Sequence, residues 1–252
     1  MKNHIVLKAA LVLLLLLATI AFSQKQENMT DPPSKENNII ILPEPMTDGK
    51  VSLEKALMGR RSIRNFSSDS LTIFEISQIL WSAQGITKKI KEPSSGWRGD
   101  KWPGGLRTAP SAGALYPIEL YIATARVTGL PQGLYKYIPQ EHTITRVLDG
   151  DKRMDISDAA LKQKSIQNAS AVIIIFGVID RTTAKYGDRA PRYVNIECGA
   201  VCQNIYLQSY TLNLGAVFAG AFNDEKLKSV LNVPENEYPL GIMPLGKKSE
   251  EK

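Results

Sequence analysis

The sequence predicts a single α+β domain in which helices flank a mixed β-sheet. Of its 252 residues 43% are apolar and 22% are charged, a composition typical of a globular protein with one sizeable core. Residues 171–179 form a nearly continuous β-branched run, as expected of a central strand covered on both faces. Residues 193–213 carry the longest helical pattern, and its apolar circumference predicts a buried helix or one at a subunit interface.

The first 23 residues predict a secretory signal peptide or an N-terminal anchor. Lys2 and Lys8 precede the apolar run 9–22, and Ala21-Phe22-Ser23 offers small residues for cleavage. The lysines favour a body outside the membrane, so we expect an exported or membrane-anchored protein that meets the membrane only through this segment. Residues 24–50 predict a polar linker whose apolar cluster, 39–42, packs on the body. The domain itself is predicted to span 51–248.

The N-terminal part of the predicted domain carries capping signals for two helices. Ser52 is placed to cap a short helix through Met58. Thr72 and Glu75 form a capping box for a second helix, which Gly85 ends.

A long functional loop is then predicted at residues 86–107, which are rich in Gly, Lys and Trp. Trp97 and Trp102 in this loop either roof a pocket or form a hydrophobic cover.

The remaining elements follow from alternation, helical spacing and capping residues. Besides the central run, the expected strands are 118–125, 133–138, 143–148, 216–219 and 239–245, and the expected helices are 155–164 and one from Asn223 to Leu231.

Charge and cysteine content restrict the function classes. Removing Lys2 and Lys8 lowers the formal charge from +6 to +4, and the basic residues are scattered, which does not call for nucleic acid. Cys198 and Cys202 lie one helical turn apart, with Cβ atoms expected about 5–6 Å apart, beyond disulfide spacing. Two buried small apolar residues are favoured. A metal site would need more ligands, so none is predicted.

Two stretches point to a ligand. Residues 59–66 place three arginines and one serine within five positions, and guanidinium groups match phosphate oxygens in pairs. The alternative is a solvated basic turn. In residues 107–117, Ser111 is placed to cap one helical turn, and the small Ala112 and Gly113 would let a flat ring approach the main chain.

Together these stretches resemble the nitroreductase family of flavin enzymes, and more closely its branch of thiazole- and oxazole-forming (SagB-type) dehydrogenases. A third element fits, with Glu197 and Gly199, then Gln203-Asn204 and Leu214-Gly215. The resemblance covers about residues 50–247. It implies a nitroreductase-like fold and a homodimer with FMN between the subunits.

The resemblance also implies roles for individual residues. Glu197 and Gly199 match the place where the family presents a backbone N–H toward flavin N5; alternatively, Glu197 is a helix-face carboxylate. The ring would contact the segment Pro110, Ser111, Ala112 and Gly113, with at least the first three coming from the neighbouring subunit. The phosphate and ribityl chain would be held by Arg60, Arg61, Ser62 and Arg64, joined by Lys247 or Lys248.

The expected reaction is hydride or electron transfer at flavin N5, which needs no protein nucleophile. Lys185 and Tyr186 match a catalytic pair of the azoline-dehydrogenase branch and are a candidate acid/base pair, or else part of a surface loop. Most relatives take electrons from NAD(P)H in the cytosol, so an exported member would need another donor or a substrate that it oxidises. Three functions stay open: an FMN-dependent oxidoreductase of a small organic substrate, an azoline dehydrogenase acting on peptides, and a non-catalytic flavin- or ligand-binding module.

Overall fold

The computed structural model describes residues 38–90 and 105–249. The described residues from Ile40 onward belong to one compact unit. The predicted signal segment, most of the linker, and Trp97 and Trp102 lie outside the described residues. None of the helices in the described part of the chain has the length and apolar character needed to span a bilayer.

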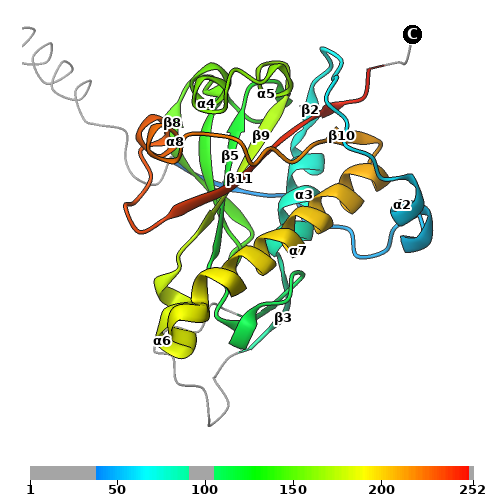
Figure 1. Ribbon diagram of the computed structural model, residues 1–252. Helices are drawn as coiled ribbons and strands as arrows, with labels where there is room; N and C mark the ends of the chain where they lie inside the picture. The colour runs from blue at the N-terminus through cyan, green and yellow to red at the C-terminus, as the bar shows by residue number, and fades with distance from the viewer. Residues whose placement is uncertain (1–37, 91–104, 250–252) are drawn as a thin grey trace, which may run out of the picture. The chain divides into compact units, whose positions relative to one another are not determined.

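A seven-stranded sheet forms the centre of the molecule (Figure 1). Across the sheet, every pairing between the second strand, β8 (Thr143–Asp149), and the last strand, β10 (Leu214–Ala216), is antiparallel. Parallel pairing occurs between β2 (Leu71–Thr72) and β6 (Val127–Thr128), in a separate two-stranded sheet. The predicted α+β fold, with helices flanking the sheet, is confirmed. The strand order is β1 (Ile39–Ile41), β8 (Thr143–Asp149), β7 (Gly133–Ile138), β5 (Ile118–Thr124), β9 (Ala171–Gly177), β11 (Tyr238–Lys247) and β10 (Leu214–Ala216).

Strand β9 separates two hydrophobic cores. Its Ile173 and Ile175 belong to one core with residues of α3 (Ile73–Gln84) and α7 (Ala190–Thr211). Val172, Ile174 and Phe176 belong to the other, with residues of α4 (Arg153–Ala159), α5 (Lys164–Gln167) and α8 (Asp224–Leu231). Every residue of β9 is buried, so the prediction of a central strand covered on both faces is confirmed.

The local capping signals produce the structures that they predict. Ser52 caps α2 (Leu53–Gly59) through the N–H of Lys55. Thr72 and Glu75 form the capping box of α3, and Gly85 is its C-cap. The Asn223 side chain caps α8.

Three predicted elements needed correction. The helix expected at 155–164 divides into α4 and α5, because Leu161 and Lys162 adopt left-handed backbone conformations. The strand expected at 216–219 begins two residues earlier, as β10 (Leu214–Ala216). The chain leaves α7 through Asn213, which has a left-handed conformation, and then pairs directly with β11. The long loop has strands at both described ends, β3 (Ile86–Lys89) and β4 (Gly105–Arg107), which pair antiparallel.

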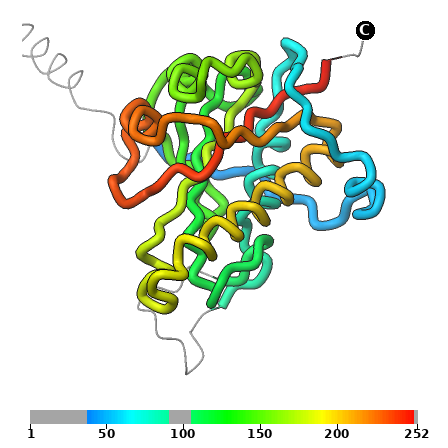
Figure 2. The backbone as a smooth tube through the Cα atoms, viewed as in Figure 1, coloured from blue at the N-terminus to red at the C-terminus, as the bar shows by residue number. Residues whose placement is uncertain are grey.

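Helix α7 runs diagonally across the molecule, as the tube in Figure 2 shows. Val194, Val201 and Ile205 are buried in the core beneath it, whereas Ile196 is 61% exposed. Cys198 and Cys202 are buried and free, with their sulfur atoms 4.0 Å apart. The prediction of two buried thiols rather than a disulfide is confirmed.

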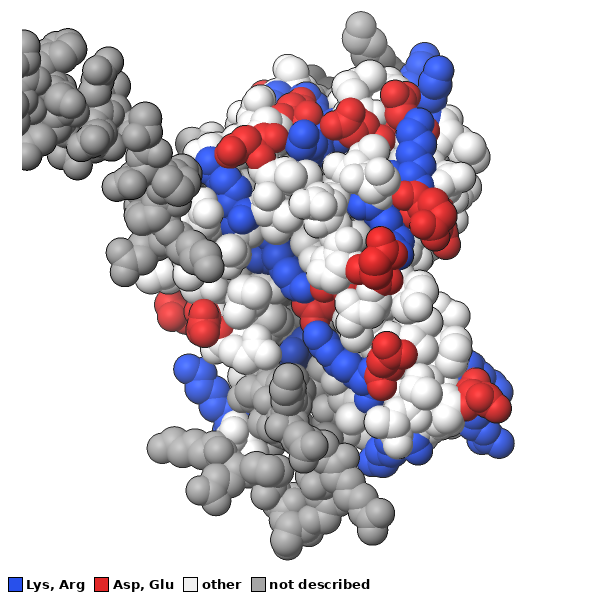
Figure 3. Space-filling model, turned by 90° about the vertical axis from the view of Figure 1, so that its left-hand side faces the viewer, with Lys and Arg blue, Asp and Glu red and all other residues white. Residues whose placement is uncertain are grey.

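Acidic and basic side chains are interspersed on the face of the molecule turned to the viewer in Figure 3. That face offers no continuous basic surface.

Replacing Thr72 with Ala should lower the free energy of unfolding by about 1 kcal/mol, because the capping oxygen for Glu75 is lost. Thr72→Ser keeps that oxygen and should retain most of the stability. Urea denaturation of the two variants checks this, and equal losses would show that the hydroxyl is not what matters.

Candidate functional site

The arginine segment is held along the edge of the central sheet. The Ile63 N–H donates to the Ala216 carbonyl of β10 (2.9 Å), and the Ser67 N–H donates to the Lys247 carbonyl of β11 (3.0 Å). A Cβ atom at Gly215 would lie 2.7 Å from the Ile63 side chain. Gly215, the second residue of the Leu214-Gly215 pair, is therefore needed for the close approach of this segment to the sheet.

Tyr206 of α7 joins the arginine segment to the long helix. The Arg60 guanidinium lies 5.1 Å from the centre of the Tyr206 ring, and the Ser62 hydroxyl lies 3.1 Å from the Tyr206 hydroxyl. The same Tyr206 oxygen accepts the Phe218 N–H at 2.7 Å. Its own proton is then available to Ser62 or to a ligand.

A cavity of about 180 Å³ lies beside this contact. It is lined by two cations, Arg61 and Lys248, and by the hydroxyl groups of Tyr206, Ser209 and Tyr210, with no carboxylate in the lining. The buried Ser209 hydroxyl has no hydrogen-bond partner among the described residues. Cations and hydroxyl donors around one cavity suit a phosphate-like anion.

The neighbouring Lys247 is directed elsewhere. Its ammonium forms an ion pair with Glu75, the capping-box carboxylate of α3. Lys248 instead lies 5.3 Å from the centre of the Tyr210 ring and lines the cavity. The structure thus favours Lys248 over Lys247, because consecutive strand residues point to opposite faces. Arg64 is exposed on the same segment.

A second cluster forms around the turn at 110–113, where Pro110 is exposed and Ala112 half-buried. Ser111 precedes the short helix η2 (Ala112–Ala114), but its hydroxyl does not cap it. It accepts the Tyr116 N–H instead, at 2.8 Å. Gly113 has a φ of +63°, and a Cβ atom there would lie 2.9 Å from both the Lys185 ammonium and the Tyr186 hydroxyl. The Lys185-Tyr186 pair, at the end of α6 (Asp180–Tyr186), therefore faces this turn.

Glu197 of α7 lies behind the turn and is 3% exposed. Burial raises its pKa to about 7, while the neighbouring Ser111, Arg107 and Gln84 act in the opposite direction. The Glu197 Oε1 atom and the Gln84 Nε2 atom have no hydrogen-bond partner among the described residues. Arg107 is itself buried, donates to the Gln84 side chain at 2.8 Å and lies 4.7 Å from the centre of the Tyr116 ring. Burial lowers the pKa of Arg107.

Within one chain, the cluster at the arginine segment and the cluster at the 110–113 turn lie apart. Glu197 and Tyr206 are nine residues apart on α7, which corresponds to about 13 Å along the helix axis. Ser111 does not line the cavity of Arg61 and Lys248.

Comparison with known proteins decides the family. The model of the nitroreductase family matches residues 57–247. The chain belongs to the nitroreductase family. It is 43% identical over 201 residues to the nitroreductase homologue MJ1384 of Methanocaldococcus jannaschii, which covers 80% of this chain and 93% of that one. Family membership indicates an oxidoreductase, and dependence on a flavin is general in the family.

Solved structures agree with this assignment. A nitroreductase homologue from Ralstonia eutropha has a TM-score of 0.70 at 26% identity, over 85% of this chain and 91% of that one. The Escherichia coli microcin synthetase McbBCD complex, with truncated pro-MccB17 bound, contains a chain with a TM-score of 0.60 at 19% identity, over 88% of this chain and 84% of that one. The second likeness shows the fold alone.

Glu197 and Gly199, which are expected to present a backbone N–H to the flavin, lie in the middle of α7, where backbone N–H groups take part in the helical hydrogen-bond pattern. Gly199 borders a cavity of about 460 Å³, together with Cys198, Gln203 and Tyr206. Glu197 contributes its carboxyl group.

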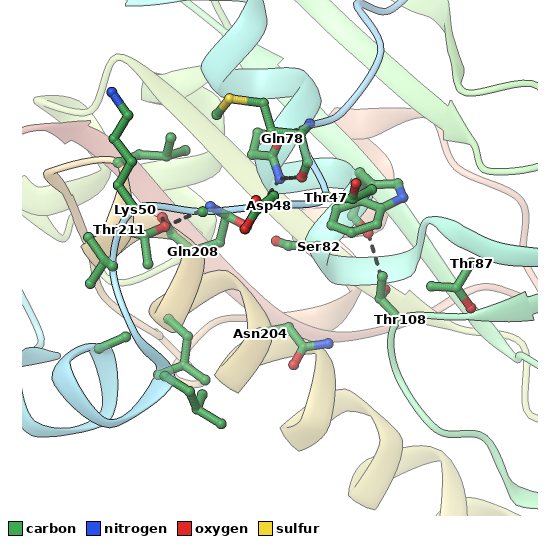
Figure 4. A pocket seen from close by; sticks show the side chains of 18 residues that line it. Thr47, Asp48, Lys50, Gln78, Ser82, Thr87, Thr108, Asn204, Gln208 and Thr211 are labelled. Carbon is green, nitrogen blue, oxygen red and sulfur yellow. Dashed lines mark hydrogen bonds between the residues drawn. The ribbon is translucent and has the colours of Figure 1, made fainter.

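A larger cavity, of about 800 Å³, lies between residues 46–51, α3 and α7 (Figure 4). Gln78 reaches across it, donating to the side chain of Gln208 (3.2 Å) and to the Met46 carbonyl (3.0 Å). Asn204 of the Gln203-Asn204 pair also lines it. No residue predicted for the cofactor lies in its wall.

Sequence reasoning missed Tyr206, Gln84 and Arg107 as site residues. Arg107 stands at the start of the second stretch, and Tyr206 lies nine positions after Glu197, so both were close to recognised signals. Gln84 precedes the helix-ending Gly85 and carried no signal of its own.

Replacing Gly113 with Ala should destabilise the chain more than replacing Gly150 with Ala. Both glycines have positive φ, and the left-handed conformation costs a residue with a Cβ about 1–2 kcal/mol. Only the Cβ at position 113 would also press on Lys185 and Tyr186, since that at 150 meets nothing within 4 Å. This contact should add a modest amount to the loss measured by urea denaturation, because the Cβ would meet the ends of the exposed Lys185 and half-buried Tyr186 side chains. Equal losses would contradict the packing of the pair against the turn.

Proposed function

We propose that this protein is an FMN-dependent oxidoreductase that transfers hydride or electrons through flavin N5 to or from a small organic substrate. The observation that carries the proposal is the cavity with two cations and an unpartnered buried hydroxyl, lined by Arg61, Lys248 and Ser209. It suits the phosphate of FMN in charge and donors. Bound FMN would supply the redox chemistry, and the chain would supply binding, orientation and protons.

In this proposal the arginine segment holds the phosphate and ribityl end. Arg60 lies against Tyr206, and Ser62 shares a hydrogen bond with the Tyr206 hydroxyl, so α7 orients both side chains. The exposed Arg64 adds positive charge on the same segment. Ionic hydrogen bonds of this kind typically contribute about 1.5–3 kcal/mol each.

The turn Pro110–Gly113 would approach the flat ring, and Lys185 and Tyr186 would be the acid/base pair beside it. Gly113 supports this arrangement, because a Cβ there would fill the space next to both side chains. Their position lets an ammonium and a phenol exchange protons with a substrate bound over the ring.

We further propose an isologous homodimer in which each FMN contacts the arginine segment of one subunit and the 110–113 turn of the other. The separation of the two clusters on one chain supports this. So do the exposed apolar side chains on the outer side of the molecule, Leu53, Leu57 and Met58 of α2 and Ile196 of α7.

We also propose that the protein is exported or membrane-anchored with its body outside. The signal-like pattern of residues 1–23 supports this placement. An exported enzyme would draw electrons from a donor other than cytosolic NAD(P)H, or would oxidise its substrate.

An azoline dehydrogenase acting on peptides is the second candidate. The Lys185-Tyr186 pair beside the turn favours it, as does the fold likeness to a chain of the microcin synthetase complex. Oxidation of a thiazoline- or oxazoline-containing peptide by the purified protein would select this function. Stable flavin binding without turnover of any donor or substrate would instead indicate a binding module.

The absorbance spectrum of the purified protein tests the main proposal. Flavin bands, followed by identification of the released cofactor as FMN by chromatography, are expected. A colourless protein that does not bind added FMN would overturn it.

Lys248→Ala should weaken FMN binding about 10- to 100-fold, which is the loss of one ionic hydrogen bond. Lys247→Ala is the matched control, because Lys247 pairs with Glu75 and does not line the cavity. It should change the dissociation constant less than about threefold. Fluorescence titration of FMN measures both, and a larger effect at position 247 would reverse the assignment.

Two variants that each lose FMN should restore binding when mixed. Arg60→Ala/Arg64→Ala removes two cations of the arginine segment of one subunit, and Ala112→Trp fills the ring position of the other. After the two chains are unfolded and refolded together, each heterodimer should hold one FMN, because one of its two sites has both halves intact. Sedimentation and the flavin content of the dimer peak give the readout. No restoration by intact dimers would mean that each site belongs to one chain.

A further inference from the structure

Two buried thiols on one face of α7 have no role in the proposed redox chemistry. Cys198 is 5% exposed and Cys202 is 8% exposed, and both are free. They lie one helical turn apart, and their sulfur atoms are separated by 4.0 Å. Both residues border the cavity of about 460 Å³ that Gly199, Gln203 and Tyr206 also line. A small ligand that enters this cavity can therefore reach the two sulfur atoms together.

The helix that carries the two thiols disfavours a disulfide between them. Residues four positions apart on a helix have Cβ atoms about 5–6 Å apart, whereas a disulfide needs about 3.5–4.5 Å. Closing the bond would require α7 to deform, and the buried Val201 and Ile205 fix this part of the helix in the core. The intact helix therefore keeps Cys198 and Cys202 as a pair of thiols.

The separation of the sulfur atoms suits a cation bound between them. The bond between a thiolate and Zn²⁺ is about 2.3 Å long, and soft cations form bonds of similar length. Two such bonds that end on sulfur atoms 4.0 Å apart enclose an angle of about 120° at the cation. This is the angle of a planar, three-coordinate site. Because Cys198 and Cys202 both border the cavity, a ligand from the cavity can fill the third position.

The number and type of ligands select the class of cation. Residues 38–90 and 105–249 contain no group of three or more His, Cys, Asp or Glu side chains that could hold a metal ion. Zn²⁺ sites use three or four protein ligands, and Ca²⁺ and Mg²⁺ take oxygen ligands. Cu(I) prefers soft sulfur ligands and forms complexes with only two or three of them. A pair of thiols with no third protein ligand therefore favours Cu(I).

We infer that Cys198 and Cys202 form a binding site for Cu(I), a soft monovalent cation, at the wall of this cavity. The inference goes beyond the proposed function and does not require FMN. Binding is a ligand exchange: each thiol releases one proton, two sulfur–copper bonds form, and copper keeps its oxidation state. The two thiolates and Cu(I) together carry one negative charge. The side-chain amides of Asn195 and Gln203 line the same cavity and can donate N–H groups to the thiolates.

Competition for Cu(I) tests the site. The full native chain, without a histidine tag, is titrated anaerobically with Cu(I) against the chelator bicinchoninate, and one tightly bound Cu(I) per chain is expected. Cys198→Ala and Cys202→Ala should each weaken binding at least about 100-fold, because each removes one of two direct ligands and the loss of an outer partner alone costs about 10–100-fold. Native affinity in either variant, or a native chain that takes no Cu(I) from the chelator, would overturn the inference.

Met154→Leu is the matched control, because Met154 offers an exposed thioether that Cu(I) can also bind. It should change the dissociation constant less than about threefold. A loss in Met154→Leu as large as that in the cysteine variants would assign the copper to thioethers and overturn the inference. Near-ultraviolet circular dichroism of the metal-free variants shows whether each retains the native packing.

X-ray absorption of the copper-loaded native chain tests the geometry without any substitution. Two or three sulfur neighbours at about 2.3 Å from copper are expected. A coordination shell of nitrogen and oxygen alone would exclude the two thiols as ligands. Zn²⁺ gives a further comparison, since a site with two protein ligands should bind it far more weakly than Cu(I). Tighter binding of Zn²⁺ than of Cu(I) would contradict the assignment of a soft monovalent cation.

Discussion

The packing of α7 on the central sheet is the constraint on which both halves of the site depend. Val194, Val201 and Ile205 fix the rotation of the helix in the core. That rotation directs Glu197 inward to the 110–113 turn and lets Tyr206 meet the arginine segment. A small rotation of α7 would disturb the phosphate end and the ring end together, because one rigid element carries a contact to each.

The sequence predicted helix starts well, because each depends on a contact between residues that are close together in the chain. The caps at Ser52, Thr72 and Asn223 depend on residues three positions apart, and all three form. The break between α4 and α5 could not be seen in this way. It depends on left-handed residues at Leu161 and Lys162, which have no intrinsic preference for that conformation.

The sequence predicted which segments form the candidate site, but not always which side chains in them do so. The arginine segment and the 110–113 turn carried clear signals, and the structure gives each a defined setting. Lys247 and Lys248 could not be told apart, since the choice depends on the register of β11 against β10. The backbone N–H groups expected to face the flavin at Glu197 and Gly199 lie within the helix that the sequence predicts at 193–213, and their role stays a prediction. Gln84 and Arg107 are paired by tertiary contact over 23 positions, which no spacing rule predicts.

The two clusters differ in electrostatic character, and this difference suits a ligand with a charged end and a flat, redox-active end. The cavity of Arg61 and Lys248 has no carboxylate in its lining and keeps a positive field for a permanent anion. Behind the turn, burial raises the pKa of Glu197 to about 7, while the nearby charge of Arg107 acts in the opposite direction. The positive charges of Arg61 and Lys248 stay the same during a reaction, so they can hold a phosphate throughout. The buried Glu197 carboxyl can instead change its charge near neutral pH, and α7 places it about 13 Å along the helix axis from Tyr206.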